Sequence, residues 1–221
     1  MLYIKMNSNP FSLRMSKRKF RKRRPKAVIP IVRRILKSYS KPQPRRFEVG
    51  QTDITMDYNG TVQLLTGVVQ GDDIVNCSGN SLIAKSLYIR GYFQNEGSLA
   101  TNHCVRLMVI EDKMHIGNAP TIPNLLQYTG SKIVVNSPLN VDSLKRYKVL
   151  VDKVVRINVQ FAGSPQFYPF KIYKKMNLKI DYTDATTGTY KNQLYIVYMS
   201  DRVTTLLPTL TYTSRLMFHD N

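Results

Sequence analysis

One group of residues in this chain has types and spacing that favour a definite chemistry, and that chemistry is phosphate binding. Residues Lys17 to Lys26 read KRKFRKRRPK, with eight basic side chains in ten positions. Between Met1 and Arg46 there are sixteen Lys or Arg residues and no acid, and the first acid is Glu48. Because like charges repel, we expect this segment to stay extended until a polyanion neutralises it. Nucleic acid is the expected partner, and an anionic membrane surface is the alternative.

An acidic pair is the only other candidate for binding chemistry. Gly71, Asp72 and Asp73 spell a tripeptide of RNA polymerase active sites, but the chain has no room for a polymerase palm domain. Asp72 and Asp73 could instead help to bind Ca²⁺ at a subunit contact, with an ordinary surface turn as the alternative. The sequence predicts no other cofactor.

The remaining reactive residue types lie apart from one another. His103, His115 and His219 have no metal-ligand spacing, and no nucleophile elbow or glycine-rich phosphate loop is present. Cys77 and Cys104 are too few for a disulfide framework, so we expect a reduced, buried pair made in a reducing compartment. We therefore predict that the chain is not an enzyme.

Two aspartates have neighbours that could neutralise them. Asp152 could pair with Lys153 and Asp201 with Arg202, or either acid could lie at an interface. The sequence leaves these alternatives open.

The elements that must position these residues divide the chain in two. Of a net charge of +19, residues 47–221 contribute only about +3. We expect a basic nucleic-acid-binding arm over residues 1–46 and one domain over 47–221, which is long enough to bury a core. No apolar run approaches a membrane span, and the N-terminus has no signal-peptide core, so we expect no membrane span and no cleaved signal.

A short amphipathic helix is predicted within the arm, at about Pro30 to Ser38. Apolar residues fall at helical spacing between basic ones, Pro30 suits the first helical turn, and Pro42 bars continuation. A helix this short needs a partner, which is either copies of itself or nucleic acid, with docking on the body as the alternative. The predicted contacts between copies are Ile31, Val32, Ile35 and Leu36.

The residues assigned to nucleic-acid binding are those basic residues of the arm that lie in the dense run, on the helix or next to the body, together with one aromatic residue. They are Lys17, Arg18, Lys19, Phe20, Arg21, Lys22, Arg23, Arg24, Lys26, Arg33, Arg34, Lys37, Arg45 and Arg46. Phe20 is the candidate for base stacking. The dense run also has the composition of a nuclear import signal.

After Arg46 the pattern is all-β. Met176 to Tyr182 and Leu210 to Phe218 alternate apolar and polar residues, as half-buried strands do. With no long helical pattern between strands, an antiparallel sandwich or barrel is expected. A loop with at most one helical turn is expected at Pro120 to Leu126. The other predicted strands are Ile54–Tyr58, Thr61–Val69, Ser81–Phe93, Cys104–Glu111, Lys132–Val135, Tyr147–Val159 and Leu194–Met199. Six aromatic residues in strand patterns are assigned to the sheet core or subunit contacts, namely Phe93, Tyr182, Tyr195, Tyr198, Tyr212 and Phe218.

Several ordered motifs resemble known viral capsid proteins. Four stretches are similar to the satellite tobacco necrosis virus coat protein family: GTVQLLTGVVQGDDIVNCSG (60–79), SLYIRG (86–91), RLMVIEDKMHIGNAPTIPNLL (106–126) and KRYKVLVDKVVRIN (145–158). NQLYIVYMSD (192–201) and TYTSRLMFHD (211–220) more closely resemble capsid proteins of small circular Rep-encoding single-stranded DNA viruses (CRESS DNA viruses).

The resemblance implies a single eight-stranded jelly roll of two packed four-stranded sheets, with the arm inside a particle. It implies an icosahedral, T=1 shell of about sixty copies that packages a single-stranded genome. Circular DNA, and with it the host nucleus, is the expected case, and satellite RNA is the alternative. A non-capsid single-strand-binding or movement-type protein is the rival from another class.

Overall fold

The structure is a computed structural model that describes residues 32–33, 44–95, 102–114, 118–130, 132–158, 166–182, 189–203 and 206–220. Two compact units are separate in it, residues 1–41 and residues 42–221. No helix in the described ranges is long and apolar enough to cross a membrane.

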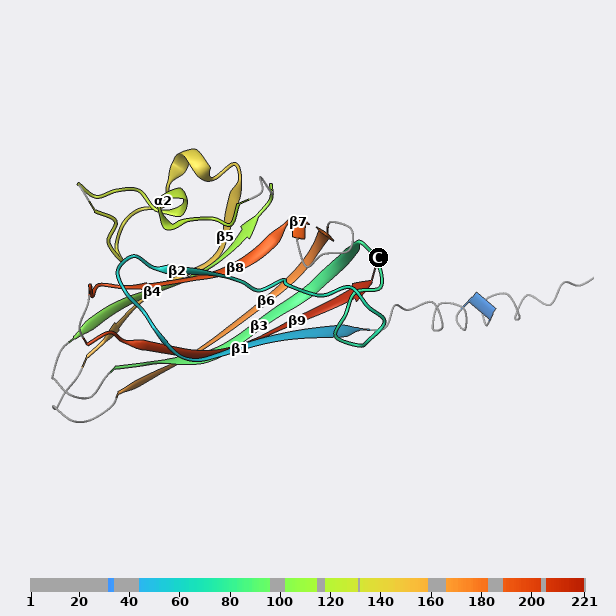
Figure 1. Ribbon diagram of the computed structural model, residues 1–221, viewed down its shortest axis with the longest axis horizontal. Coiled ribbons are helices and arrows are strands. Elements are labelled where there is room, and N and C mark those ends of the chain that lie inside the picture. Colours follow the sequence, from blue (N-terminus) through green and yellow to red (C-terminus); the bar gives the residue numbers. More distant parts are fainter. Residues whose placement is uncertain are drawn as a thin grey trace, which may run out of the picture. The chain divides into compact units, whose positions relative to one another are not determined.

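The larger unit contains two antiparallel sheets packed face to face (Figure 1). In the described residues the first sheet has the order β1-β9-β3-β6-β7, and its strands are Arg45–Thr55, Thr209–Asp220, Ser81–Gln94, Phe167–Tyr182 and Thr189–Lys191. The second sheet has the order β2-β8-β4-β5, and its strands are Thr61–Leu64, Gln193–Ser200, His103–Asp112 and Tyr147–Ile157. Each sheet combines strands from both ends of the domain, so that the fold is a jelly roll.

The alternating sequence of the strands explains the core between the two sheets. Along β9, Leu210, Tyr212, Leu216 and Phe218 are buried, and the residues between them face away from the second sheet. Apolar residues of β3, β4, β6 and β8 join this cluster from both sheets. Burial of this surface is the main term that holds the sheets together.

The predicted eight-stranded jelly roll is confirmed, and the three-residue strand β7 adds a short ninth strand at one sheet edge. Two strand predictions were too short or shifted. The predicted strand at Ile54 to Tyr58 is the end of β1, which begins at Arg45, and β6 begins nine residues before Met176. The predicted strand Lys132–Val135 forms only an isolated bridge between Thr129 and Lys132.

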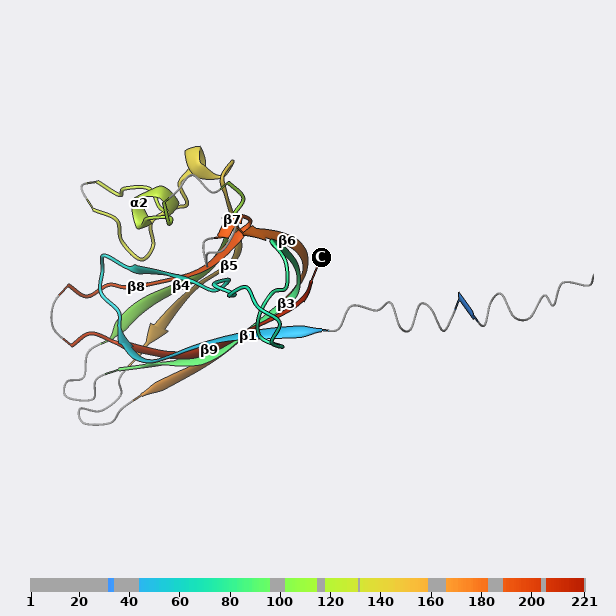
Figure 2. The same ribbon diagram turned by 45° about the vertical axis from the view of Figure 1, so that its right-hand side comes forward.

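The connection between β4 and β5 covers the outer face of the four-stranded sheet (Figures 1 and 2). Its described part contains one α-helical turn, α2 (Ile122–Leu125), and one 3₁₀ turn, η1 (Val141–Ser143). The single helical turn is the one expected from the sequence. Ile122, Leu125 and Leu126 pack there with Ile110 and other apolar residues of β4 and β8 as a second core.

A glycine makes room for this cover. Gly60 has a φ of +70°, and a Cβ atom there would lie 2.9 Å from Ile122 Cδ1 and 3.1 Å from Met199 Cβ. Any side chain at this position would therefore push against both the cover and β8.

Candidate nucleic-acid interface

Most of the predicted binding residues lie outside the described residues. This holds for Lys17 to Lys26, for Arg34 and Lys37, and for the helix contacts Ile31, Ile35 and Leu36. Val32 and Arg33 are described, and both are helical and exposed. The roles assigned to all these residues in nucleic-acid binding and in contacts between copies stay predictions.

Arg45 is the first residue of β1, two positions inside the range assigned to the arm. Its Nη1 donates to the carbonyls of Asn76 at 2.6 Å and Asp73 at 3.2 Å. Its Nη2 donates to Ser78 Oγ at 2.8 Å and lies 3.0 Å from Asp220 Oδ2. This set of bonds, which we call the Arg45 clamp, joins β1, β9 and the loop before β3. The nucleic-acid contact assigned to Arg45 stays a prediction, and the structure adds a role inside the domain.

Arg46 points away from the core on the same strand. Its Nε lies 3.9 Å from a carboxylate oxygen of Glu48, and Arg215 Nε of β9 donates to the same oxygen at 2.8 Å. All three side chains are at least 40 % exposed. One acid therefore serves two arginines at the surface, which leaves this corner of the sheet cationic.

The two acids of the calcium hypothesis lie on an exposed loop between β2 and β3. Asp72 and Asp73 are both exposed, and the carbonyl of Asp73 is already part of the Arg45 clamp. Within the described ranges, no group of three or more His, Cys, Asp or Glu side chains is placed to hold a metal ion. A calcium site at this loop would need oxygen ligands from a second subunit, and it stays a prediction.

Buried arginines fasten the cover to the four-stranded sheet. Arg106 of β4 pairs with Asp152 of β5 through two bonds of 2.9 and 2.7 Å and donates to the carbonyls of Val135 and Ser137. The side chain of Arg106 is only 6 % exposed. Arg146 makes a similar two-bond pair with Asp112. Bidentate pairs of this kind fix geometry as well as charge.

His103 is fully buried at the start of β4. Arg202 Nε donates to its Nδ1 at 3.3 Å, and Asp201 Oδ1 lies 3.9 Å from the same atom. Burial, and secondarily the charge of Arg202, lower the pKa of His103, with Asp201 opposing. This histidine is therefore a neutral acceptor at neutral pH.

The cysteines and core aromatics are structural. Cys77 is buried and Cys104 is half-buried, and neither forms a disulfide. Burial raises the pKa of both thiols, which lowers the reactive thiolate fraction. The six aromatic residues assigned to the sheet core or subunit contacts are all buried, as predicted.

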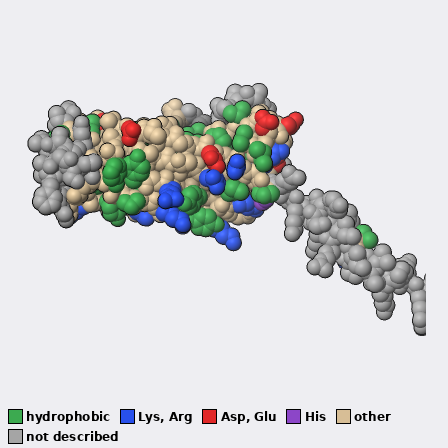
Figure 3. Space-filling view, turned by 90° about the horizontal axis from the view of Figure 1, so that it is seen from below, with side chains coloured by type: hydrophobic (Ala, Val, Ile, Leu, Met, Phe, Trp, Pro, Cys, Tyr) green, Lys and Arg blue, Asp and Glu red, His purple; other side chains and the backbone are tan. Residues whose placement is uncertain are grey.

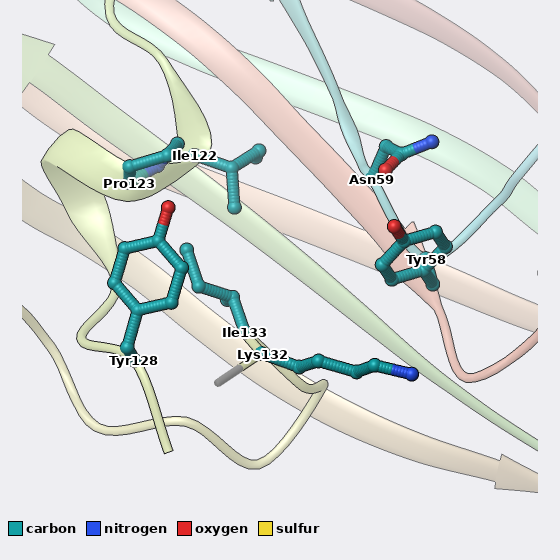
Figure 4. Close-up of a pocket in the computed structure, with 7 residues that line it drawn as sticks. All are labelled: Tyr58, Asn59, Ile122, Pro123, Tyr128, Lys132 and Ile133. Atoms are coloured by element: carbon teal, nitrogen blue, oxygen red, sulfur yellow. The ribbon is translucent and has the colours of Figure 1, made fainter. Parts of the chain in front are cut away.

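A pocket of about 270 Å³ lies between the β1–β2 loop and the cover (Figure 4). Tyr58 and Tyr128 line opposite sides, Ile122 and Ile133 are part of its apolar wall, and Lys132 is its only charged side chain. The lining contains no carboxylate, histidine or cysteine, so it offers no general base or nucleophile of the usual types.

The sequence interpretation missed the outward side of the five-stranded sheet. Arg90 and Lys171 lie side by side there, next to a row that contains Tyr88 and Tyr173. The alternation of buried Ile89 with its exposed or half-exposed neighbours was readable, but the first half of β6 was not recognised as a strand.

A jelly roll that follows a strongly basic N-terminal segment defines a class, the single-jelly-roll viral coat proteins. Residues 15–221 match the satellite tobacco necrosis virus coat protein family, so the chain belongs to this family. A capsid function, assembly with copies of itself and a place in the virion follow from that membership. The family's role is structural rather than catalytic.

Comparison with solved structures finds only distant likenesses, in 23 chains. A chain of Desmodium yellow mottle tymovirus is 10 % identical, with a TM-score of 0.39 and coverage of 82 % of this chain and 89 % of that one. A chain of infectious bursal disease virus, Gx strain, is 14 % identical, with a TM-score of 0.28 and coverage of 80 % of this chain and 33 % of that one. The present chain thus spans about a third of the latter. No curated protein matches, and the family match alone carries the assignment.

Proposed function

We propose that about sixty copies of this chain close into a T=1 shell and package a single-stranded genome through the basic arm. The observation that carries this proposal is the separation of charge, with sixteen basic residues and no acid up to Arg46 and a nearly neutral domain after it. The shell domain supplies the contacts between subunits, and the arm supplies positive charge for phosphate. The proposal assigns no catalytic step to the chain.

The charge of the arm also suggests the size of the cargo. If each arm neutralises about sixteen phosphates, about sixty copies neutralise on the order of a thousand nucleotides. A single strand of that length can coil in a small shell, whereas duplex DNA is stiff over about 50 nm. Circular DNA is the expected genome because of the import-like run and the C-terminal motifs, and RNA is the alternative. With DNA, the arm would also engage nuclear import machinery.

The experiment follows from the position of β1. Deletion of residues 1–41 removes most of the arm and leaves β1 and the Arg45 clamp in place. A full-length variant with glutamine at the eight basic positions of Lys17 to Lys26 is the control for chain length. Both variants should lose packaged nucleic acid. If both package as much as the unaltered chain, the arm is not the packaging device.

Two further measurements settle the shell and the genome. Negative-stain microscopy of the purified protein should show uniform particles, and a persistent monomer at high concentration would contradict the sixty-copy shell. Separate DNase and RNase digestion of nucleic acid extracted from particles identifies the sugar. Loss under DNase alone supports the DNA proposal, and loss under RNase alone overturns it.

A further inference from the structure

The outer face of the five-stranded sheet has a composition that its role in the fold does not require. We define the open face by six side chains that point away from the core: Tyr88 and Arg90 of β3, Lys171, Tyr173 and Lys175 of β6, and Arg215 of β9. Figure 3 shows this side of the domain, where Lys and Arg side chains lie among apolar and tyrosine side chains. No described segment covers it as the β4–β5 connection covers the other sheet.

Strand register orders these side chains into rows. Tyr88 lies between Arg215 on one neighbouring strand and Tyr173 on the other. Arg90 and Lys171 face each other in the next outward row. Rows of this kind are about 6.8 Å apart along a strand, and strands are about 4.8 Å apart. Rings and cations thus alternate on the scale of single nucleotides.

The charges of the open face are not balanced within the sheet. Arg215 pairs with Glu48, but no ion pair among the described residues involves Arg90, Lys171 or Lys175. Like charges directly opposite each other on neighbouring strands destabilise a sheet. The Arg90 and Lys171 pair is therefore unfavourable for folding, and an anionic ligand between the two cations would relieve the repulsion.

The rings of the open face are placed to receive flat ligands. Tyr173 is 63 % exposed, and no item of the core covers its ring. Lys171 Nζ lies 5.6 Å from the centroid of the Tyr88 ring, so that a cation and an aromatic face are presented together. Tyrosines beside unpaired cations match a base beside its phosphate, whereas a lipid surface requires inserted apolar side chains.

We propose that the open face is a second binding surface for single-stranded nucleic acid. Tyr88 and Tyr173 stack on bases, and Arg90, Lys171 and Lys175 contact phosphates. The strand β1 of this sheet begins directly after the arm in sequence, so that one strand of nucleic acid can serve both. This inference deepens the packaging function proposed above and rests on it.

The first test is cross-linking in assembled particles of the full chain. Ultraviolet irradiation followed by protease digestion and mass spectrometry should find nucleotides attached to the β3 and β6 peptides that contain Tyr88 and Tyr173. A single Tyr173→Leu substitution, at an exposed position, should remove the β6 cross-link and leave the particles intact. Cross-links confined to the arm would overturn the inference.

The second test compares two variants of equal charge loss. The face variant carries Arg90→Gln, Lys171→Gln and Lys175→Gln, and the control carries Lys145→Gln, Lys153→Gln and Arg156→Gln, all exposed and outside the open face. In anisotropy titrations with a single-stranded oligonucleotide, loss of three phosphate contacts should reduce the salt slope by about 2 for the face variant. The control should keep the unaltered slope, and equal slopes in both variants would overturn the inference.

Failure of the inference and failure of the packaging proposal can be told apart. If the arm variant loses its cargo while the face variant keeps both its cargo and its slope, the arm function stands and the open-face inference is overturned. If the β3 and β6 cross-links are found but the arm variant still packages fully, the open-face inference stands and the arm proposal fails. Vesicles of phosphatidylserine test the rival ligand. Vesicle binding that the face variant loses, with an unchanged oligonucleotide slope, would overturn the inference in favour of a membrane.

Discussion

The two sheets of the jelly roll share one core between them, but their outer faces differ. The outer face of the four-stranded sheet is apolar, lies under the β4–β5 connection and is tied to it by buried Arg106 and Arg146. The outer face of the five-stranded sheet presents tyrosines and cations, and no described segment lies over it. The chain completes one face by itself and leaves the other for a partner.

The difference teaches that an arginine has opposite uses on the two sheets. On the covered side, each buried guanidinium has a carboxylate and carbonyl partners, and its removal would leave these unsatisfied. On the open side, Arg215 is about half exposed and shares one acid with Arg46. Substitutions matched between the sheets should therefore separate effects on stability from effects on binding.

The largest expected effect is from an apolar truncation under the cover. Ile110→Ala removes a fully buried side chain of β4 and should lower the free energy of unfolding by about 3.5 kcal/mol, because a cavity remains. The matched change on the open face, Tyr173→Ala, should cost less than about 0.5 kcal/mol. Urea unfolding of dissociated subunits, followed by circular dichroism, measures both. Similar losses would mean that the open face is also covered in the subunit.

A second pair of variants compares two arginines. Arg106→Ala leaves Asp152 and two carbonyls without their partner, so the free energy of unfolding should fall by about 3 kcal/mol. Arg215→Ala breaks an exposed pair and should cost at most about 1 kcal/mol. The same urea titration decides, and the comparison fails if Arg215→Ala is the more damaging change.

Strand periodicity was sufficient to predict the jelly roll but not the cover. Met176 to Tyr182 and Leu210 to Phe218 alternate, and both are half-buried strands in the structure. In β8 all eight residues are buried, and a continuous apolar run of that kind indicates cover on both faces. That signal was present in the sequence and was not used.

Long-range partners could not be predicted from the sequence. Asp152 pairs with Arg106, 46 positions away, rather than with Lys153, because adjacent residues of a strand point to opposite faces. The start of β1 was missed because Arg45 and Arg46 continue the charge of the arm, although Phe47 and Val49 already show the period of a strand. Of the predicted binding site, only Val32, Arg33, Arg45 and Arg46 or their close neighbours fall within the described residues, so its arrangement stays a prediction.

A third pair of variants tests where the arm gives way to the sheet. Arg45→Ala removes the Arg45 clamp and should lower the free energy of unfolding by about 2 kcal/mol, as expected for hydrogen bonds that involve a charged group. Arg46→Ala, one position later on the exposed side, should cost less than about 0.5 kcal/mol. Urea titration measures both, and equal small losses would place Arg45 energetically with the arm.

The smallest expected effect is a dependence of stability on pH that resides in the covered sheet. The pKa of His103 is lowered in the folded chain by burial, so below the ordinary value of about 6.5 the unfolded chain binds more protons than the folded one. Stability should therefore be constant above that pH with respect to this group and should fall as the pH drops below it. Thermal melts between pH 7.5 and 5.5 should show a decreasing Tm.

Two histidine variants assign this pH dependence to one sheet. His103→Gln should flatten the decrease in Tm, because the substituted side chain does not titrate, whereas His219→Gln on β9 should leave the decrease as it is. The cations of the open face, Arg90 and Lys171, keep their charge throughout this range because Arg and Lys titrate far above it. Acidification should thus weaken the subunit without changing the oligonucleotide salt slope. If the slope and the Tm fall together in the unaltered chain but not in His103→Gln, the two faces are coupled and the separation drawn between them is wrong.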